Sequence, residues 1–153
     1  MQTRIVDIDT YMPVLQDLLK QGKEVPLIIT GNSMSPFLIH KRDEILISPP
    51  DGKWKKGDMA FFRRTDGAYV MHRIVKVEQG RRYYFIGDGQ LVVEGPIEES
   101  QIFGKITAVK RKDRWIGPGD FWWEFFEHVW LECVSIRPVL RKGYSLLTFW
   151  KKK

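Results

Sequence analysis

The spacing of apolar residues at the start of the chain predicts a helix over residues 10–21. Asp9 or Thr10 can cap its first turn, and Gly22 is well placed to end it. The apolar positions recur every three to four residues, as on one face of a helix. They are Tyr11, Val14, Leu15, Leu18 and Leu19.

From residue 25 to about residue 112, the pattern changes to short runs of β-branched and apolar residues separated by turn residues. Asp66-Gly67, between two such runs, predicts a β-hairpin. Many short strands without helices between them are typical of an antiparallel sheet. We therefore expect a mainly β fold, a partly closed antiparallel barrel or sandwich. The predicted strands are 25–30, 44–48, 59–63, 69–77, 83–87 and 104–110.

After the turn at Gly117-Pro118-Gly119, the pattern becomes helical again. Residues 121–134 place acids on one face and aromatic residues over most of the rest. Pro138 interrupts this pattern, and an apolar and basic segment follows over 139–150. The predicted units are an N-terminal helix (1–24), a β-rich domain (25–112) and a helical, aromatic-basic C-terminal segment (119–153).

Composition agrees with one globular domain. The 153 residues are 43% hydrophobic and 29% charged, and the single cysteine, Cys133, leaves no internal disulfide. No run reaches the roughly 18 apolar residues of a membrane-spanning helix, and the first ten residues lack the apolar stretch of a signal peptide. We therefore expect a cytoplasmic or peripheral membrane protein.

The net charge of +6, from 25 basic and 19 acidic residues, favours anionic partners without identifying one. No nucleic-acid-binding motif accompanies it, so we expect no nucleic acid partner. Trp122, Trp123, Trp130 and Trp150 precede a lysine-rich end. This segment can serve as peripheral contact with an anionic membrane surface. Equally, it can cover the open side of the barrel or form a homodimer interface.

The segment Gly31-Asn32-Ser33-Met34-Ser35-Pro36 follows a predicted strand and can present a hydroxyl on a sharp turn. Gly31 permits unusual backbone angles, and the amide of Ser33 can face a developing oxyanion. A hydrolytic serine needs such a turn, a base and oxyanion donors. Taken alone, the hexapeptide is also typical of an ordinary turn.

Further motifs follow in order: Gly57-Asp58-Met59, His72-Arg73-Ile74 and Gly87-Asp88-Gly89. Together with the hexapeptide, they resemble the ordered motifs of the signal peptidases and the LexA-type serine peptidases. The resemblance covers about residues 25–110, and it implies a peptidase fold with Ser33 as the nucleophile. Four short motifs in the right order are far more specific than any one of them.

The resemblance assigns the base to His72, because histidine followed by Arg and an aliphatic residue is similar to the endoplasmic-reticulum and archaeal branch. A histidine suits the role, since its ordinary pKa of about 6.5 leaves it largely neutral near pH 7. The other histidines, His40 and His128, fit ordinary surface positions. Asp88 matches the carboxylate that orients the histidine, but it also fits a turn aspartate.

The chain departs from the family pattern after Asp88. Gln90 stands where Asn is usual, and only Glu94 is available as the later carboxylate, so the third catalytic member stays open between Asp88 and Glu94. The resemblance implies an endopeptidase that cleaves a leader, a propeptide or itself, with a peptide or protein substrate and no cofactor or metal. The alternative is a LexA-like peptide-binding or regulatory module with little or no catalysis.

Overall fold

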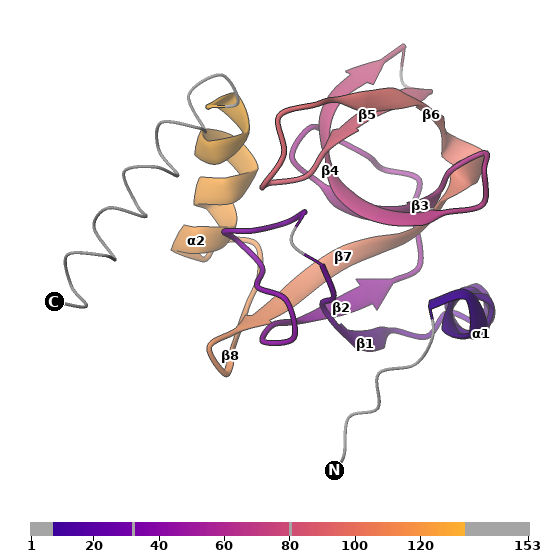
Figure 1. Ribbon diagram of the computed structural model, residues 1–153, viewed down its shortest axis with the longest axis horizontal. Coiled ribbons are helices and arrows are strands. Elements are labelled where there is room, and N and C mark those ends of the chain that lie inside the picture. Colours follow the sequence, from indigo (N-terminus) through magenta and orange to yellow (C-terminus); the bar gives the residue numbers. More distant parts are fainter. Residues whose placement is uncertain (1–7, 32, 80, 134–153) are drawn as a thin grey trace, which may run out of the picture.

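The computed structural model describes residues 8–31, 33–79 and 81–133 (Figure 1). The predicted segment 139–150 lies outside the described residues. The main elements are α1 (Ile8–Lys20), β1 (Val25–Ile28), β2 (Glu44–Ser48), β3 (Met59–Arg63), β4 (Tyr69–Glu78), β5 (Arg82–Ile86), β6 (Glu94–Glu98), β7 (Ile102–Arg111), β8 (Arg114–Ile116) and α2 (Phe121–Glu124). A short 3-10 helix, η1 (Glu99–Gln101), precedes β7, and a π-helical stretch, η2 (Phe125–Trp130), continues α2.

The strands form one antiparallel sheet in the order β1-β2-β7-β3-β4-β5-β6, and β8 pairs with β7. Strands β3 to β6 curl around one another, while β1 and β2 extend to one side (Figure 1). The two end strands of this order do not pair with each other, so the sheet is not closed. This confirms the predicted mainly β fold.

The predicted helix and the predicted strands all appear, with ends that differ by a few residues. The hairpin at Asp66-Gly67 is also confirmed: the amide of Ala68 donates to the Asp66 carboxylate, and Gly67 has a φ of +94°. A left-handed φ of this kind suits glycine because it lacks Cβ.

Two strands were not predicted, β6 and β8. Gly95-Pro96 predicts a break, but the structure places both residues inside β6. The reason is that β6 is the last strand of the sheet and pairs only with β5, so Pro96 can occupy an edge without removing a needed donor. The pairing of β5 with β6 also shifts register between Tyr83 and Phe85.

Helix α1 packs its apolar face onto the sheet. Met12, Leu15 and Leu19 are buried in the core with Ile45 and Ile47 of β2. Full burial of a leucine contributes roughly 2 kcal/mol relative to exposure, so this face holds the helix against the sheet. A second buried cluster, around Phe62 and Phe85, fills the curl of β3 to β5.

The second helix covers Phe37, which follows the Ser33 turn. Trp123 and Phe126 are buried, with ring centroids 6.3 Å and 4.7 Å from that of Phe37. Phe121 and Trp122 lie on the outer side and are largely exposed. Part of the aromatic set is therefore packed against the β-rich domain. Within the described residues, no helix has the length and apolar character needed to cross a membrane.

Candidate active site

Ser33 lies on the turn that follows β1. Gly31 adopts a φ of +89°, and its amide donates a 2.6 Å hydrogen bond to Nδ1 of His40. Beyond Ser33, Met34 and Phe37 are buried, with 2% and 0% of their surface exposed. The turn is thus held by a side-chain hydrogen bond on one side and by core packing on the other, while Ser33 itself stays half-buried.

His72 lies in the middle of β4, opposite Ala60 of β3. Its side chain is 4% exposed, and its ring meets Phe62 edge-on at 6.3 Å between centroids. Because a β-strand fixes the direction of each side chain, this position gives the imidazole a defined orientation in an apolar setting.

Ser33 and His72 line the same cavity, which has a volume of about 260 Å³. No hydrogen bond joins the Ser33 hydroxyl to the His72 ring in the described part of the chain. The walls of this cavity come from α1, β1, the Ser33 turn, β3 and the residue after it, β4 and the loop after β5. They include Met12, Leu27, Ile29, Met34, Phe61, Arg64, Tyr69, Met71 and Gln90.

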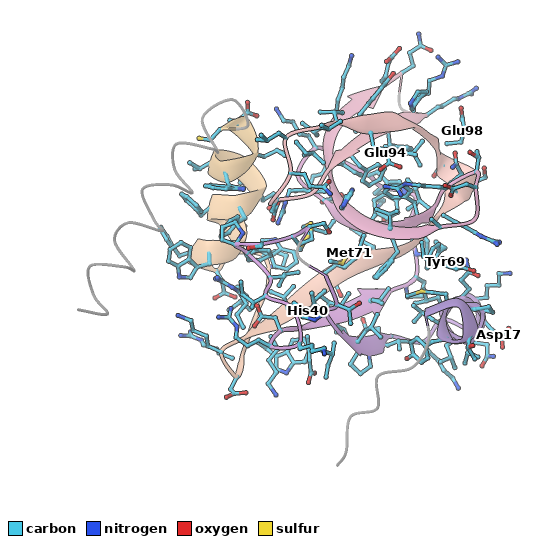
Figure 2. All side chains as sticks on the ribbon, viewed as in Figure 1. Asp17, His40, Tyr69, Met71, Glu94 and Glu98 are labelled. Carbon is cyan, nitrogen blue, oxygen red and sulfur yellow. The ribbon has the colours of Figure 1, made fainter. Side chains whose placement is uncertain are left out.

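Two strand edges border this cavity. Among the described strands, β1 pairs only with β2, and β4 begins to pair with β5 at Arg73, so the β4 residues before it pair with β3 alone. In Figure 2, Tyr69 and Met71 lie between the curled strands and the side of the molecule that holds β1 and α1. The cavity is therefore flanked by backbone that can pair with an extended peptide.

Burial controls the charge of His72. Desolvation lowers its pKa from 6.5 to about 4, and the nearby Arg64 cation also lowers it, whereas the charges of Glu94 and Asp88 raise it. Nδ1 of His72 is buried and has no hydrogen-bond partner among the described residues. The imidazole is therefore neutral near pH 7, which is the state that a general base requires.

Asp88 is completely buried and pairs with Arg73, the residue after His72. The Arg73 guanidinium donates from Nε and Nη2 to the two carboxylate oxygens, each at 2.9 Å, and from Nη1 to the carbonyl of Gly57. Two parallel bonds of this kind fix the carboxylate strongly. Asp88 thus reaches His72 through its charge, and no hydrogen bond joins the two side chains among the described residues.

Glu94 lies at the start of β6 and pairs with Arg64. The two bonds are 2.6 Å and 2.7 Å long, and the side chains are 26% and 41% exposed. Of the neighbouring charges, Glu94 has the largest effect on the pKa of His72. The sequence left the third catalytic member open between Asp88 and Glu94. Both carboxylates lie close enough to act on His72 electrostatically. Which of the two is the third catalytic member stays a prediction.

The loop after β5 contacts the Ser33 turn directly. The amide of Gly89 donates to the carbonyl oxygen of Ser33 at 2.8 Å. A Cβ at Gly87 would lie 2.3 Å from the same oxygen, so this close approach requires glycine. The Gly-Asp-Gly motif therefore links the Ser33 turn to the strand of His72 through Asp88.

Sequence reasoning missed three contributors to this arrangement. His40 is exposed, as expected of a surface histidine, but it also accepts the hydrogen bond from the Gly31 amide. Arg73, the residue after His72, is a fully buried partner of Asp88. Trp130, on the C-terminal helix, donates to the carbonyl of Asp88. Of these three residues, only Arg73 could have been found from the sequence, because it belongs to the His72-Arg73-Ile74 motif.

The fold and the cavity define a class: mainly β proteins in which a turn serine and a buried strand histidine share one cleft. The chain belongs to the Peptidase S24-like family, whose model matches residues 2–107. Membership suggests a serine peptidase kind of hydrolase or a LexA-like function. A comparison with curated proteins finds no match. The second helix, from Phe121 onward, lies outside the matched residues.

Proposed function

We propose that this protein is a serine endopeptidase of the histidine-base type, with Ser33 as the nucleophile and His72 as the general base. The observation that carries the proposal is that both side chains line one cavity in which burial keeps the histidine neutral. Family membership supports the same kind of chemistry.

In the proposed reaction, the Ser33 hydroxyl oxygen attacks the peptide carbonyl carbon while His72 accepts the hydroxyl proton. The carbonyl oxygen becomes an oxyanion, for which the backbone amide of Ser33 is the proposed donor. His72 then gives its proton to the leaving amine as the C–N bond breaks, which leaves an acyl-enzyme. Water, deprotonated by His72, attacks the ester, and the proton returns to Ser33 as the acid product leaves.

The same burial that keeps His72 neutral opposes its protonation during catalysis. The charges of Glu94 and Asp88 act in the opposite direction, because each raises the pKa of His72. In the proposed mechanism, these carboxylates stabilise the imidazolium without a direct hydrogen bond. Their contribution is electrostatic and grows as substrate excludes water from the cleft.

The proposed substrate is an extended segment of a peptide or protein. Its backbone would pair with the edges of β1 and of the first half of β4, which flank the cavity. The cavity is smaller than the roughly 300–1,000 Å³ of a typical small-molecule site, and its walls are polar and apolar in about equal parts. It therefore suits one compact side chain beside the cut, in a leader, a propeptide or the protein itself.

A second candidate is a peptide-binding module that keeps the peptidase fold with little or no turnover. It is favoured by one observation: Nδ1 of His72 has no hydrogen-bond partner among the described residues. A catalytic histidine usually has its orientation fixed by such a partner.

A fluorophosphonate probe, which labels activated serines, tests the proposal with matched controls inside the chain. We expect labelling of the wild type, loss of labelling in Ser33→Ala and retention in Ser35→Ala, because Ser35 lies on the same turn with similar exposure. We expect His72→Gln to slow labelling by about a hundredfold or more, in line with loss of a general base, and His128→Gln to leave it unchanged.

Labelling that persists in Ser33→Ala would contradict the assignment of the nucleophile. A wild type that binds unlabelled peptides but is not labelled between about pH 6 and pH 9 would favour the binding module instead, since His72 is neutral throughout that range. Thermal midpoints of all variants, compared with the wild type, show whether a loss of labelling reflects unfolding.

A further inference from the structure

A buried hydrogen bond connects the C-terminal helix to the candidate active site. The indole Nε1 of Trp130 donates to the carbonyl oxygen of Asp88 at 2.7 Å, and the Trp130 side chain is 7% exposed. In Figure 1, the loop after β5 reaches toward this helix. A buried carbonyl that loses its donor is costly, so this bond constrains where the loop can lie.

The loop that Trp130 holds has contacts with both catalytic segments. The Asp88 carboxylate is fixed by Arg73, which follows His72 on β4. The amide of the next residue, Gly89, donates to the carbonyl of Ser33. The single peptide unit between Asp88 and Gly89 thus accepts a hydrogen bond from the helix and donates one to the Ser33 turn, while the Asp88 side chain is bound to β4 through Arg73.

The helix is itself fixed against the same region. Phe126 packs on Phe37, at the end of the Ser33 turn, with ring centroids 4.7 Å apart. Glu127 is 6% exposed, accepts a 2.7 Å hydrogen bond from Lys55, and lies so close to Gly57 that a Cβ there would sit 2.4 Å from its Cγ. These contacts hold the helix where Trp130 can reach Asp88.

We infer that Trp130 is a positioning residue, through which the C-terminal helix sets the geometry between Ser33 and His72. The inference rests on the proposed serine peptidase function for its catalytic consequence, but the anchoring of the loop stands without it. It also gives a role to the helix, which lies beyond the residues matched by the family model.

Replacing Trp130 with Phe removes the N–H and keeps most of the buried ring. The carbonyl of Asp88 then lacks this donor, and the loop gains freedom at the point where it contacts the Ser33 turn. We expect the first-order inactivation rate with the fluorophosphonate probe to fall about tenfold, because a small displacement of catalytic groups has a large effect on rate. The probe concentration at half-maximal rate should stay unchanged, since Trp130 does not line the cavity.

The matched control is Trp123→Phe. Trp123 is equally buried, at 7% exposed, and packs on Phe37 from the same helix, but it makes no hydrogen bond to the loop among the described residues. Both substitutions remove a similar amount of buried ring, but only Trp130→Phe also removes a buried hydrogen bond, so its thermal midpoint should fall further. Only Trp130→Phe should slow inactivation.

Hydrogen exchange supplies a readout that needs no activity. Amides of residues 87–93 should exchange about tenfold faster in Trp130→Phe than in Trp123→Phe, while those of β2 and β7 exchange alike in both. In the wild type, NMR should show the Trp130 indole proton exchanging slowly, at a rate similar to that of the Gly89 amide. The wild-type measurement also applies where either variant fails to fold.

Equal inactivation rates and equal loop exchange in the two variants would overturn the inference, as would a rapidly exchanging Trp130 indole proton. Faster loop exchange with unchanged inactivation would overturn the positioning role. A wild type without Ser33-dependent labelling would refute the proposed peptidase function, and the exchange experiments would still decide whether Trp130 anchors the loop.

Discussion

The burial of His72 should make the folded protein measurably less stable in acid. At neutral pH the side chain is neutral and 4% exposed, in contact with the Phe62 ring. In the unfolded chain the same group gains a proton near its ordinary pKa of about 6.5. Lowering the pH therefore favours the unfolded state through this one residue, and His72→Gln should remove that effect.

The direction follows from the two pKa values. The folded pKa, about 4, lies below the unfolded value of 6.5, so the unfolded chain binds more protons at any pH between them. The contribution of His72 to stability is therefore complete above about pH 6.5. It declines as the pH falls and is fully lost below about pH 4. At about 1.4 kcal/mol for each pKa unit, the loss amounts to roughly 3 kcal/mol.

The assay is urea unfolding of the wild type and of His72→Gln at a series of pH values from about 8 to about 4. Carboxylates titrate in both proteins, so their effect cancels in the difference between the two free energies of unfolding. That difference should change by roughly 3 kcal/mol across the range in favour of the variant.

This reasoning would be refuted if the free energies of unfolding of the wild type and of His72→Gln fell in parallel as the pH is lowered. Such a result would mean that the histidine keeps an ordinary pKa in the folded protein. The desolvation argument for a neutral base would then fail, and with it the main electrostatic support for the proposed mechanism.

Two further predictions concern the supports of the site. Asp88→Asn leaves the buried Arg73 without a counter-charge and should lower the free energy of unfolding, measured in urea, by about 3–5 kcal/mol. Glu94→Gln changes a half-exposed ion pair and should lower it by less than about 1 kcal/mol. Equal losses in the two variants would contradict the buried-pair argument. His40→Ala removes the acceptor for the Gly31 amide, worth about 1 kcal/mol, and should slow fluorophosphonate labelling roughly fivefold. An unchanged labelling rate would show that this bond does not hold the serine turn.

The candidate site illustrates which contacts a sequence can reveal. The ordered motifs pointed to Ser33, His72 and Asp88, and the structure brings Ser33 and His72 to one cavity. The motifs could not show that Asp88 is held by Arg73, because that pair depends on how the loop after β5 folds back over β4. The bond from His40 to the turn was hidden for the same reason, since no local pattern marks it.

The sequence by itself determined the first helix and most strands, because these depend on local periodicity and turn residues. It also predicted the mainly β fold. It could not place β6, where Gly95-Pro96 predicts a break, since tolerance of proline depends on the strand lying at the sheet edge. Nor could it show the contact of Trp130 with Asp88. Edge position, burial and long-range hydrogen bonds arise only when distant segments pack together, and so the tertiary structure alone decided them.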